Sequence, residues 1–319
     1  MPLVYIIVLN WNGWEMTSSC LSSLRALTYP NFRILVVDNG STDGSPEKIR
    51  SEWPEIELLE TGENLGFAGG NNQGILAALK AQADYILLLN NDTTVDPSLV
   101  QEFVAHMQTL PNPGILGATV YLHSKPTHLD HLGGIWNPKR SAFDLIGHLE
   151  PARMWTDVMP LDYVCGCAFF VSRAVFSDVG LLDPRFFLYW EESDFCFRAR
   201  KQGWKSYSIP TAKVWHHVSA SFVGGKPHST YFFHRNRLLW LEKHCRKKIP
   251  KILSVSLFRY IKLYCLKSLH VLYGRIFGAD SALQHERLAK LCLYRAALCG
   301  LFDYTRRRFG SSPSSLSRR

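Results

Sequence analysis

The chain has 319 residues and a net charge of +9, with 46% hydrophobic and 20% charged residues. This is the composition of a globular protein with material for one large domain or two smaller ones. The sequence contains no run of about 18 apolar residues, which excludes a membrane-spanning helix. It also lacks the basic stretch and cleavage site that would predict a signal peptide.

The charge is divided unevenly along the chain. Residues 231–319 hold 19 Lys and Arg against 4 Asp and Glu, whereas residues 1–230 hold 17 against 23. An acidic body with a strongly basic C-terminal part indicates an anionic partner for that part. The eight cysteines form no metal-binding framework, because Cys165 and Cys167 are one residue apart and the others are scattered. We therefore expect reduced thiols and a cytoplasmic protein.

Strands and helices alternate in the first 110 residues. Apolar runs predict four strands, at 3–9, 32–37, 56–59 and 86–89. The intervening and following segments predict helices at 15–27, up to residue 53, up to about residue 80, and at 97–109 with Pro97 in its first turn. The pattern predicts an α/β fold with a mainly parallel central sheet flanked by helices.

Three of these strands end in polar clusters, Asn-Trp-Asn-Gly at 10–13, Asp-Asn-Gly-Ser-Thr-Asp at 38–43 and Asn-Asn-Asp at 90–92. Ligands bind beyond the carboxyl ends of parallel strands, so the clusters are expected to converge on one site. Each alone is ordinary turn chemistry, and Asp92 alone could cap the next helix. Three together favour a nucleotide site in which an acid holds Mg²⁺ or Mn²⁺ against a diphosphate.

Other stretches are less specific. The glycine-rich run Asn-Leu-Gly-Phe-Ala-Gly-Gly-Asn-Asn at 64–72 is neither a dinucleotide fingerprint nor a P-loop. Residues 121–160 hold four histidines and several prolines at spacings that match no metal site, and we expect a variable loop region there. Residues 161–172 predict a further buried strand with small residues.

Three carboxylates, Glu191, Glu192 and Asp194, begin a helix predicted to run to about residue 202, directly after the aromatic run Phe-Leu-Tyr-Trp at 187–190. Negative charge at a helix N-terminus complements the helix dipole. The functional alternative is a general base whose pKa is tuned by its aromatic neighbours. His216 and His217 follow a short strand, where a histidine pair is more often structural than functional.

Together these stretches resemble the inverting glycosyltransferases of family 2, which have the GT-A fold, and look most like their bacterial rhamnosyltransferase-like branch. The resemblance covers nearly the whole chain. Besides the clusters above, it includes Gly-Cys-Ala-Phe-Phe-Val at 166–171, Trp-Glu-Glu-Ser-Asp at 190–194, Tyr-Phe-Phe-His-Arg-Asn-Arg-Leu at 231–238 and Gly-Leu-Phe-Asp-Tyr at 300–304.

The resemblance implies roles for individual residues. Nucleotide-sugar binding falls to eight of them: Asn10, Trp11, Asp38, Asn64, Gly69, Asn71, Asn90 and Asn91. A divalent cation, Mg²⁺ or Mn²⁺, would be held by Asp92 and His216. Glu192 occupies the position of the catalytic base, with Glu191 and Asp194 beside it. Two positions depart from the family pattern, because Asn90 and Glu192 stand where the family often has Asp; the first weakens the expectation of a metal requirement.

The implied reaction transfers a sugar, from dTDP-rhamnose or a UDP-sugar, with inversion to a lipid-linked or polysaccharide acceptor in cell-surface polysaccharide biosynthesis. The implied domain plan is a GT-A domain at 1–226, with nucleotide-binding and acceptor-binding halves at about 1–120 and 121–226. A helical region follows at 227–310, and 311–319 form a disordered basic tail. An imperfectly amphipathic basic helix predicted at 249–277 favours peripheral binding to an anionic membrane at its cytoplasmic face. Nucleic acid is the weaker alternative partner, since no recognition motif is present.

Two other functions stay open. A sugar-nucleotide nucleotidyltransferase also combines a nucleotide-binding α/β domain with acids, but residues 10–14 hold no Lys or Arg for a triphosphate. A sugar-nucleotide-binding protein that has lost catalysis is supported only by the departures at Asn90 and Glu192. The sequence does not indicate an oligomeric state.

Overall fold

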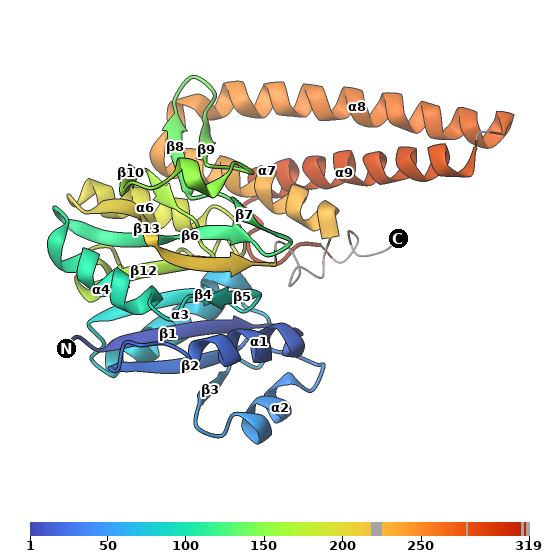
Figure 1. Cartoon of the computed structure of the whole chain (residues 1–319). Coiled ribbons are helices and arrows are strands. Elements are labelled where there is room, and N and C mark those ends of the chain that lie inside the picture. The colour runs from blue at the N-terminus through green and yellow to red at the C-terminus, as the bar shows by residue number, and fades with distance from the viewer. Residues whose placement is uncertain (218–224, 279, 314–315, 317–319) are drawn as a thin grey trace. The chain divides into compact units, whose positions relative to one another are not determined.

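The structure is a computed structural model, and it describes residues 1–217, 225–278, 280–313 and 316. The chain divides into two compact units, whose elements are labelled in Figure 1. The first unit consists of Met1–Pro184 and Glu191–Ser221, and the second of Arg185–Trp190 and Phe222–Arg319. The short segment Arg185–Trp190 thus groups with the C-terminal helices, although the residues on both sides of it belong to the first unit.

The first unit is built on a ten-stranded sheet with the order β10-β13-β6-β12-β4-β1-β2-β3. In it, β5 (Thr93–Val95) also pairs with β13 (Lys205–His216), and β7 (Lys125–Leu129) with β6 (Pro113–Leu122). The parallel core consists of β1 (Val4–Asn10), β2 (Phe32–Asp38), β3 (Glu57–Glu60) and β4 (Tyr85–Asn90). These are the four strands predicted from the apolar runs, each within one residue at either end. The α/β class with a mainly parallel central core is therefore confirmed.

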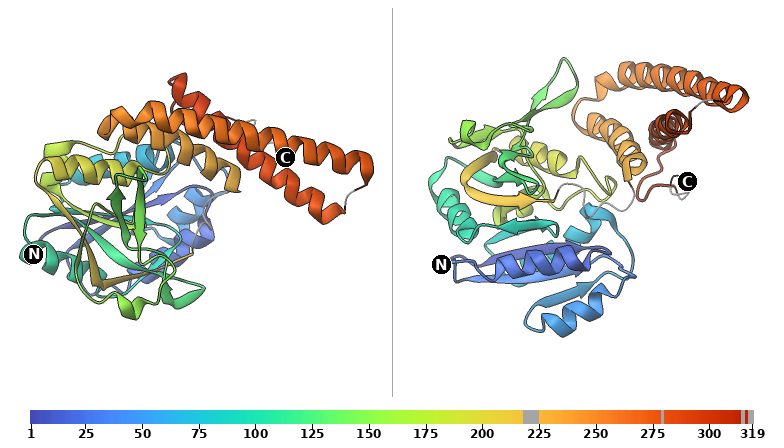
Figure 2. Two further views of the ribbon diagram at one scale, coloured as in Figure 1. Left: turned by 90° about the horizontal axis from the view of Figure 1, so that it is seen from above. Right: turned by 45° about the vertical axis from the view of Figure 1, so that its right-hand side comes forward.

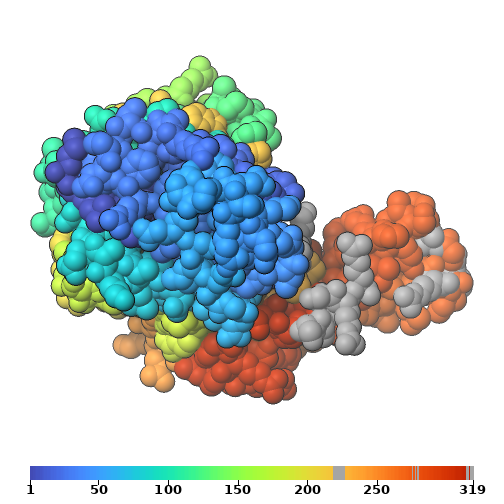
Figure 3. Space-filling model, turned by 90° about the horizontal axis from the view of Figure 1, so that it is seen from below, coloured from blue at the N-terminus to red at the C-terminus, as the bar shows by residue number. Residues whose placement is uncertain are grey.

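Helices cover both faces of this sheet, since successive residues of its central strands point to opposite faces and are mostly buried. Along β1, Val4, Ile6 and Val8 belong to one apolar cluster, and Tyr5 and Ile7 to the other. The first cluster includes residues of α1 (Trp14–Leu24), α2 (Ser45–Glu52) and α4 (Leu99–Thr109). The second includes residues of α3 (Gly66–Lys80), α5 (Arg173–Val179) and α6 (Glu191–Lys201). The N-terminal part of this unit forms a continuous surface in the view from below, coloured blue in Figure 3.

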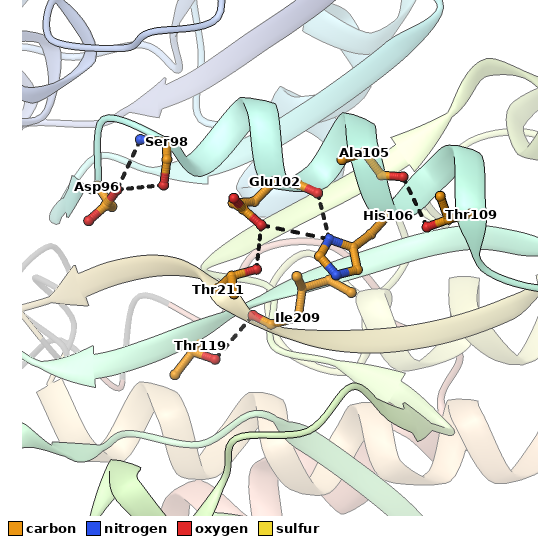
Figure 4. A network of polar contacts seen from close by, with 9 residues as sticks. All are labelled: Asp96, Ser98, Glu102, Ala105, His106, Thr109, Thr119, Ile209 and Thr211. Carbon is orange, nitrogen blue, oxygen red and sulfur yellow. Dashed lines mark hydrogen bonds and ion pairs between the residues drawn. The ribbon is translucent and has the colours of Figure 1, made fainter.

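Helix α4 begins two residues later than predicted. Asp96 Oδ1 accepts hydrogen bonds from Ser98 N at 2.9 Å and from Ser98 Oγ at 2.7 Å, so Asp96 and Pro97 form a turn before the helix (Figure 4). The same view shows how α4 is tied to the sheet, because Thr211 Oγ1 of β13 (Lys205–His216) donates to Glu102 Oε2. Helix α1 also ends earlier than predicted, at Leu24 rather than residue 27.

The expectation of a variable loop over residues 121–160 is wrong, because much of this stretch forms strands. They are the end of β6 (Pro113–Leu122), β7 (Lys125–Leu129), β8 (Gly133–Asn137), β9 (Ala142–Ile146) and β10 (Met159–Leu161). A second sheet has the order β11-β8-β9. The prolines and histidines in this stretch interrupt the apolar pattern from which strands are predicted. The pairing of β8 with β11 needs a glycine at position 133, because an added Cβ there would lie 2.1 Å from Tyr163 O.

The single strand predicted at 161–172 is also wrong. The stretch is divided between the end of β10, β11 (Tyr163–Val164) and β12 (Ala168–Ser172), with a turn at residues 166–167. The small residues at 165–167 therefore change the direction of the chain between two sheets, instead of lying in the middle of one strand.

The second unit is helical. It contains α7 (Gly225–His244), α8 (Ile249–Phe277), which has the bounds predicted from the sequence, and α9 (Ser281–Thr305). Helix α9 packs along both α7 and α8, and Figure 2 shows α8 and α9 side by side. The backbones of α7 and α9 approach closely at Gly300, where an added Cβ would lie 2.5 Å from Tyr231 O. In the described residues, no helix is both long enough and apolar enough to cross a bilayer.

Candidate functional site

The polar clusters predicted at the strand ends meet at one edge of the sheet. In the parallel register, Asn10 at the end of β1 pairs with Asp38 at the end of β2. On the other side of β1, Leu9 pairs with Asn90 at the end of β4. The three clusters that follow these strands therefore begin next to one another, as parallel pairing demands.

Asn10 and Asp38 form a buried hydrogen-bonded pair. Asn10 Nδ2 donates to Asp38 Oδ2 at 2.7 Å and to Ser41 Oγ at 3.1 Å, and Ser41 N donates to Asp38 Oδ1 at 2.9 Å. The Asp38 side chain is only 2% exposed. Each carboxylate oxygen can accept more than one hydrogen bond, so Asp38 keeps capacity for a ligand while its orientation is fixed.

Asn91 extends this network through the first turn of α1. Its Nδ2 donates to Thr17 Oγ1 at 2.9 Å, and Thr17 Oγ1 in turn donates to Asn10 Oδ1 at 2.8 Å. At Gly13, an added Cβ would lie 2.8 Å from Asn91 Nδ2, so a side chain there would displace that amide. Trp11 lies partly exposed in the loop between β1 and α1.

The glycine-rich run holds α3 against the sheet. Asn64 Oδ1 accepts from Gly66 N at 2.8 Å and from Asn39 Nδ2 at 3.2 Å, which joins this turn to the loop after β2. Gly69 and Asn71 lie inside α3, where Asn71 Nδ2 donates to Phe67 O at 2.9 Å. The run thus has a packing function that does not depend on any ligand.

A carboxylate, a histidine and a second carboxylate are aligned beside these strand ends. His216 Nε2 lies 3.2 Å from Asp92 Oδ1, and His216 Nδ1 lies 3.0 Å from Asp130 Oδ2. Burial of the ring opposes its charged form, but the hydrogen bonds to Asp130 and Asp92 outweigh burial and raise the pKa of His216 to about 10. Burial likewise disfavours ionisation of Asp130, but its hydrogen bond to His216 leaves the pKa of that carboxyl lowered.

The Asp92 and His216 side chains fit a divalent cation. A carboxylate oxygen and an imidazole nitrogen are both ligands of divalent cations, and Asp92 Oδ1 and His216 Nε2 lie 3.2 Å apart. A metal-binding histidine usually donates its other ring N–H to a carboxylate, a backbone carbonyl or water, and Asp130 is such a carboxylate for His216. Among the described residues, no group of three or more His, Cys, Asp or Glu could hold a metal ion. Oxygens of a diphosphate or water would therefore complete the coordination.

Glu192 lies at the start of α6 with an oxygen that is available as a base. Its Oε2 is shielded from solvent and has no hydrogen-bond partner among the residues that the structure describes. Burial raises the pKa of Glu192, against the opposing effects of a backbone hydrogen bond and of the nearby His131. Gly166 borders the carboxylate, since an added Cβ there would lie 3.8 Å from Glu192 Oε1.

Of the other two acids of α6, Asp194 has different surroundings. Asp194 is fully buried, and its Oδ2 accepts from Arg198 Nε at 2.9 Å. Arg198 also donates to the carbonyl oxygens of Val179 and Leu181, so Asp194 fixes a contact between α6 and the end of α5. Glu191 is also buried, and its Oε2 is shielded from solvent like that of Glu192.

Sequence reasoning missed several residues of this site. Asp130 and His131 lie in the stretch that was expected to be a variable loop, and only the adjacency of an acid and a histidine hinted at them. Ser41 and Thr17 belong to turns beside the expected ligand residues, and their hydroxyl groups carried no separate signal. Asn39 was covered by the Asp-Asn-Gly-Ser motif without a function of its own.

Comparison with known proteins defines the class. Residues 5–180 match the family model "Glycosyl transferase family 2", and the chain belongs to this family. The match disfavours the nucleotidyltransferase alternative. The fold is the GT-A glycosyltransferase fold, shared with a mannosyltransferase from Pyrobaculum calidifontis solved with GDP-Man and Mn²⁺. That likeness has a TM-score of 0.57 at 14% identity and covers 97% of this chain and 88% of the other.

Curated relatives narrow the class to rhamnosyltransferase-like members of the family. The chain is 29% identical over 265 residues to an N-acetylglucosaminyl-diphospho-decaprenol L-rhamnosyltransferase of Mycobacterium tuberculosis, covering 73% of this chain and 84% of the relative. It is 23% identical over 262 residues to the dTDP-rhamnosyl transferase RfbF of Shigella flexneri, covering 79% and 83%. The chain is therefore a rhamnosyltransferase-like glycosyltransferase.

Proposed function

We propose that this glycosyltransferase transfers a sugar, from dTDP-rhamnose or a UDP-sugar, with inversion to a lipid-linked or polysaccharide acceptor in cell-surface polysaccharide biosynthesis. The names of the relatives support the donor and acceptor classes. The observation that carries the reaction is the Glu192 carboxylate, whose Oε2 is buried without a hydrogen-bond partner among the described residues. A carboxylate with a raised pKa and a free lone pair suits proton abstraction.

In this mechanism Glu192 accepts the proton of an acceptor hydroxyl while that oxygen attacks the anomeric carbon of the donor. The new bond forms on the face opposite the departing nucleoside diphosphate, so one displacement inverts the configuration. Burial favours the step, because it raises the pKa of Glu192 and so makes its carboxylate a stronger base. A retaining reaction would need a second carboxylate nucleophile beneath the sugar.

The strand-end clusters bind the donor in this proposal. Asp38, fixed by Asn10 and Ser41, accepts hydrogen bonds from the nucleoside. The other side chains of the donor site are those implied by the resemblance, Trp11, Asn64, Gly69, Asn71, Asn90 and Asn91. Asp92 and His216 would hold Mg²⁺ or Mn²⁺, which stabilises negative charge on a leaving diphosphate. Asp130 keeps the His216 ring oriented, and His216 Nε2 has to lose its proton before it can bind the cation.

The test combines a donor screen with Glu192→Gln. Wild type is incubated with dTDP-rhamnose and common UDP- and GDP-sugars plus a polyprenyl-diphosphate-linked acceptor, and products are identified by mass. Glu192→Gln should bind the donor as wild type does and transfer about 10²–10⁴-fold more slowly, the usual effect of losing a general base. Glu191→Gln is the matched control and should be affected less. Full transfer by Glu192→Gln would place the chemistry elsewhere, and no turnover of any sugar nucleotide by wild type would favour a binding protein.

We also propose that the second unit binds peripherally to an anionic membrane at its cytoplasmic face. Helix α8 contains five Lys and Arg and no Asp or Glu. It also exposes large apolar side chains along its length, including Phe258 at 74%, Ile276 at 63% and Leu269 at 62% exposed. Apolar side chains beside basic ones match an anionic lipid surface, whereas pairing with a second α8 would bring like charges together.

Flotation with liposomes tests the membrane proposal. Full-length protein should float with vesicles that contain anionic lipid and less with neutral ones, and added salt should weaken the binding. Phe258→Ser with Leu269→Ser should reduce flotation, whereas Leu76→Ser, an exposed leucine of α3, serves as the control. Failure of the wild-type protein to float with any anionic vesicle would refute this part.

A further inference from the structure

The segment Arg185–Trp190, which immediately precedes Glu191 and Glu192, has an unusual backbone. Phe187, Tyr189 and Trp190 have φ angles of +65°, +67° and +77°. Residues with a Cβ avoid this left-handed region, because the Cβ crowds the backbone. Such conformations persist where the surrounding structure enforces them, and they cluster at functional sites.

Two buried side chains of α7 hold this backbone in place. Asn236 Nδ2 lies within hydrogen-bond distance of three carbonyl oxygens, those of Phe186 at 2.7 Å, Leu188 at 2.7 Å and Tyr189 at 2.9 Å. The amide has two hydrogens, so the three acceptors share them. Arg235 Nη2 donates to Phe186 O at 2.9 Å and, more weakly, to the preceding carbonyl at 3.2 Å. Both side chains are fully buried.

Aromatic side chains of α7 hold the same segment through its rings. Phe187 stacks on Phe232 with ring centroids 5.3 Å apart. The ring centroid of Trp190 lies 5.6 Å from that of Phe233 and 5.9 Å from that of Trp240. Helix α7 therefore fixes the backbone of the segment by hydrogen bonds and its side chains by packing.

Arg235 holds this segment at a cost in free energy, because its positive charge is buried. In the part of the chain that the structure describes, Arg235 forms no salt bridge. Its guanidinium donates to neutral oxygens, which include Asn236 Oδ1 at 2.9 Å and Gly310 O at 2.6 Å. Burial of this charge is costly and lowers the pKa of the guanidinium, an effect that Tyr231 and the Asp303 carboxylate behind it oppose only in part. Five donors in a planar fork explain why arginine is nevertheless used, because they reach several carbonyl oxygens at once.

We propose that Arg235 and Asn236 are positioning residues for sugar transfer. By fixing the backbone of Arg185–Trp190, they hold the residue that is bonded to the start of α6, and this restricts the conformations open to the Glu192 carboxylate. The link is covalent, because Trp190 is bonded to Glu191, the first residue of α6. The stretch at 231–238 resembles the rhamnosyltransferase-like branch, and the resemblance implied no role for its residues. The proposal gives two of them a role. The inference rests on the proposed role of Glu192.

The test separates the rate of the chemical step from donor binding. Asn236→Ala removes the donors, and Asn236→Asp keeps the shape of the side chain but replaces the amide with a group that repels carbonyl oxygens. Both should lower kcat about 10–10²-fold, the effect of displacing a catalytic group by about 1 Å, while donor KM and nucleoside diphosphate affinity stay near wild type. Arg235→Lys should act in the same direction, because one ammonium cannot replace the fork. Hydrogen exchange in a peptide covering 185–195 should speed up, with exchange in β1 and β4 unchanged.

Tyr304→Phe is the matched control. It removes a 2.9 Å hydrogen bond to Glu242 in the same helical unit but does not touch the segment. It should keep the wild-type kcat even if its thermal midpoint falls. If Asn236→Asp and Arg235→Lys fold and keep the wild-type kcat while Glu192→Gln does not, the positioning role is wrong and the base is right. Full activity of Glu192→Gln would overturn both. The positioning role would also be wrong if the Asn236 variants lost kcat and donor affinity equally, in proportion to a loss of folded protein.

Discussion

Replacing His216 with Gln tests the alignment of Asp92, His216 and Asp130. The two carboxylates overcome the effect of burial and raise the pKa of His216 from 6.5 to about 10. A histidine whose folded pKa is raised contributes stability that is fully present below its unfolded pKa, near 6.5, and is lost as the pH rises through about 10. The variant lacks this contribution at every pH. Its free energy of unfolding should therefore lie far below that of wild type at pH 6 and close to it at pH 10.

The magnitude follows from the size of the shift. About 3.5 pKa units at 1.36 kcal/mol each give roughly 5 kcal/mol, an upper bound for the loss at pH 6. A domain of about 200 residues loses roughly 2–4 °C of Tm per kcal/mol. His216→Gln should therefore lower Tm by up to about 10–20 °C at pH 6, and the difference should shrink steadily between pH 7 and pH 10.

Thermal unfolding followed by circular dichroism at pH 6, 8 and 10 measures this, with EDTA present so that no cation replaces the proton. His217→Gln is the control. The His217 ring stacks on His123 with centroids 3.5 Å apart, and the pKa of His217 is lowered by burial. The Tm of His217→Gln should not fall further below that of wild type as the pH is lowered. A Tm difference for His216→Gln that is the same at pH 6 and pH 10 would refute the ion-pair reasoning.

Three further predictions concern the site and the sheet beneath it. Because burial raises the pKa of Glu192, the acid limb of the kcat profile should fall at a pH above the 4.5 of an ordinary glutamate, with the rate rising as the base ionises; a limb at or below 4.5 would contradict this. Asp38→Ala should weaken nucleoside diphosphate binding with or without Mn²⁺, whereas Asp92→Ala should abolish only the part that depends on Mn²⁺, as calorimetry can show. Gly74→Ala places a Cβ 2.7 Å from Ile7 Cγ2 and should cost about 1–3 kcal/mol in urea unfolding, and an unchanged midpoint would mean that α3 moves freely away from β1.

The parallel core and its strand-end clusters could be predicted because both are local signals. Each core strand is a continuous apolar run, and each cluster follows its strand directly, so sheet geometry alone brings Asn10, Asp38 and Asn90 together. The helix start that carries Glu192 was predicted in the same way, whereas the role of Glu192 as the base came from the resemblance to the family and stays a prediction. Its solvent-shielded oxygen was not visible, because that depends on neighbours from other elements.

Asp130 could not be predicted, and the reason is distance along the chain. It contacts His216, 86 residues later, only because β6 pairs in parallel with β13 and in antiparallel with β7. Neither pairing leaves a periodic signal in a stretch rich in proline and histidine. Asn236 posed the same difficulty, since its amide sits at an unremarkable helical position and its partners are backbone oxygens 47 to 50 residues earlier.

The contact between Arg235 and Gly310 has a consequence for the order of events during synthesis. The two residues are 75 positions apart, and Arg235 Nη1 needs the carbonyl oxygen of Gly310 to complete its set of acceptors. At about 5–20 residues per second, a ribosome takes roughly 4–15 s to travel between them. Throughout that interval α6 and Glu192 have already been made, while α7 still lacks α9 as a packing partner. From the proposed roles of the strand-end clusters and of Arg235, we therefore expect a nascent chain to bind donor well before it can catalyse transfer.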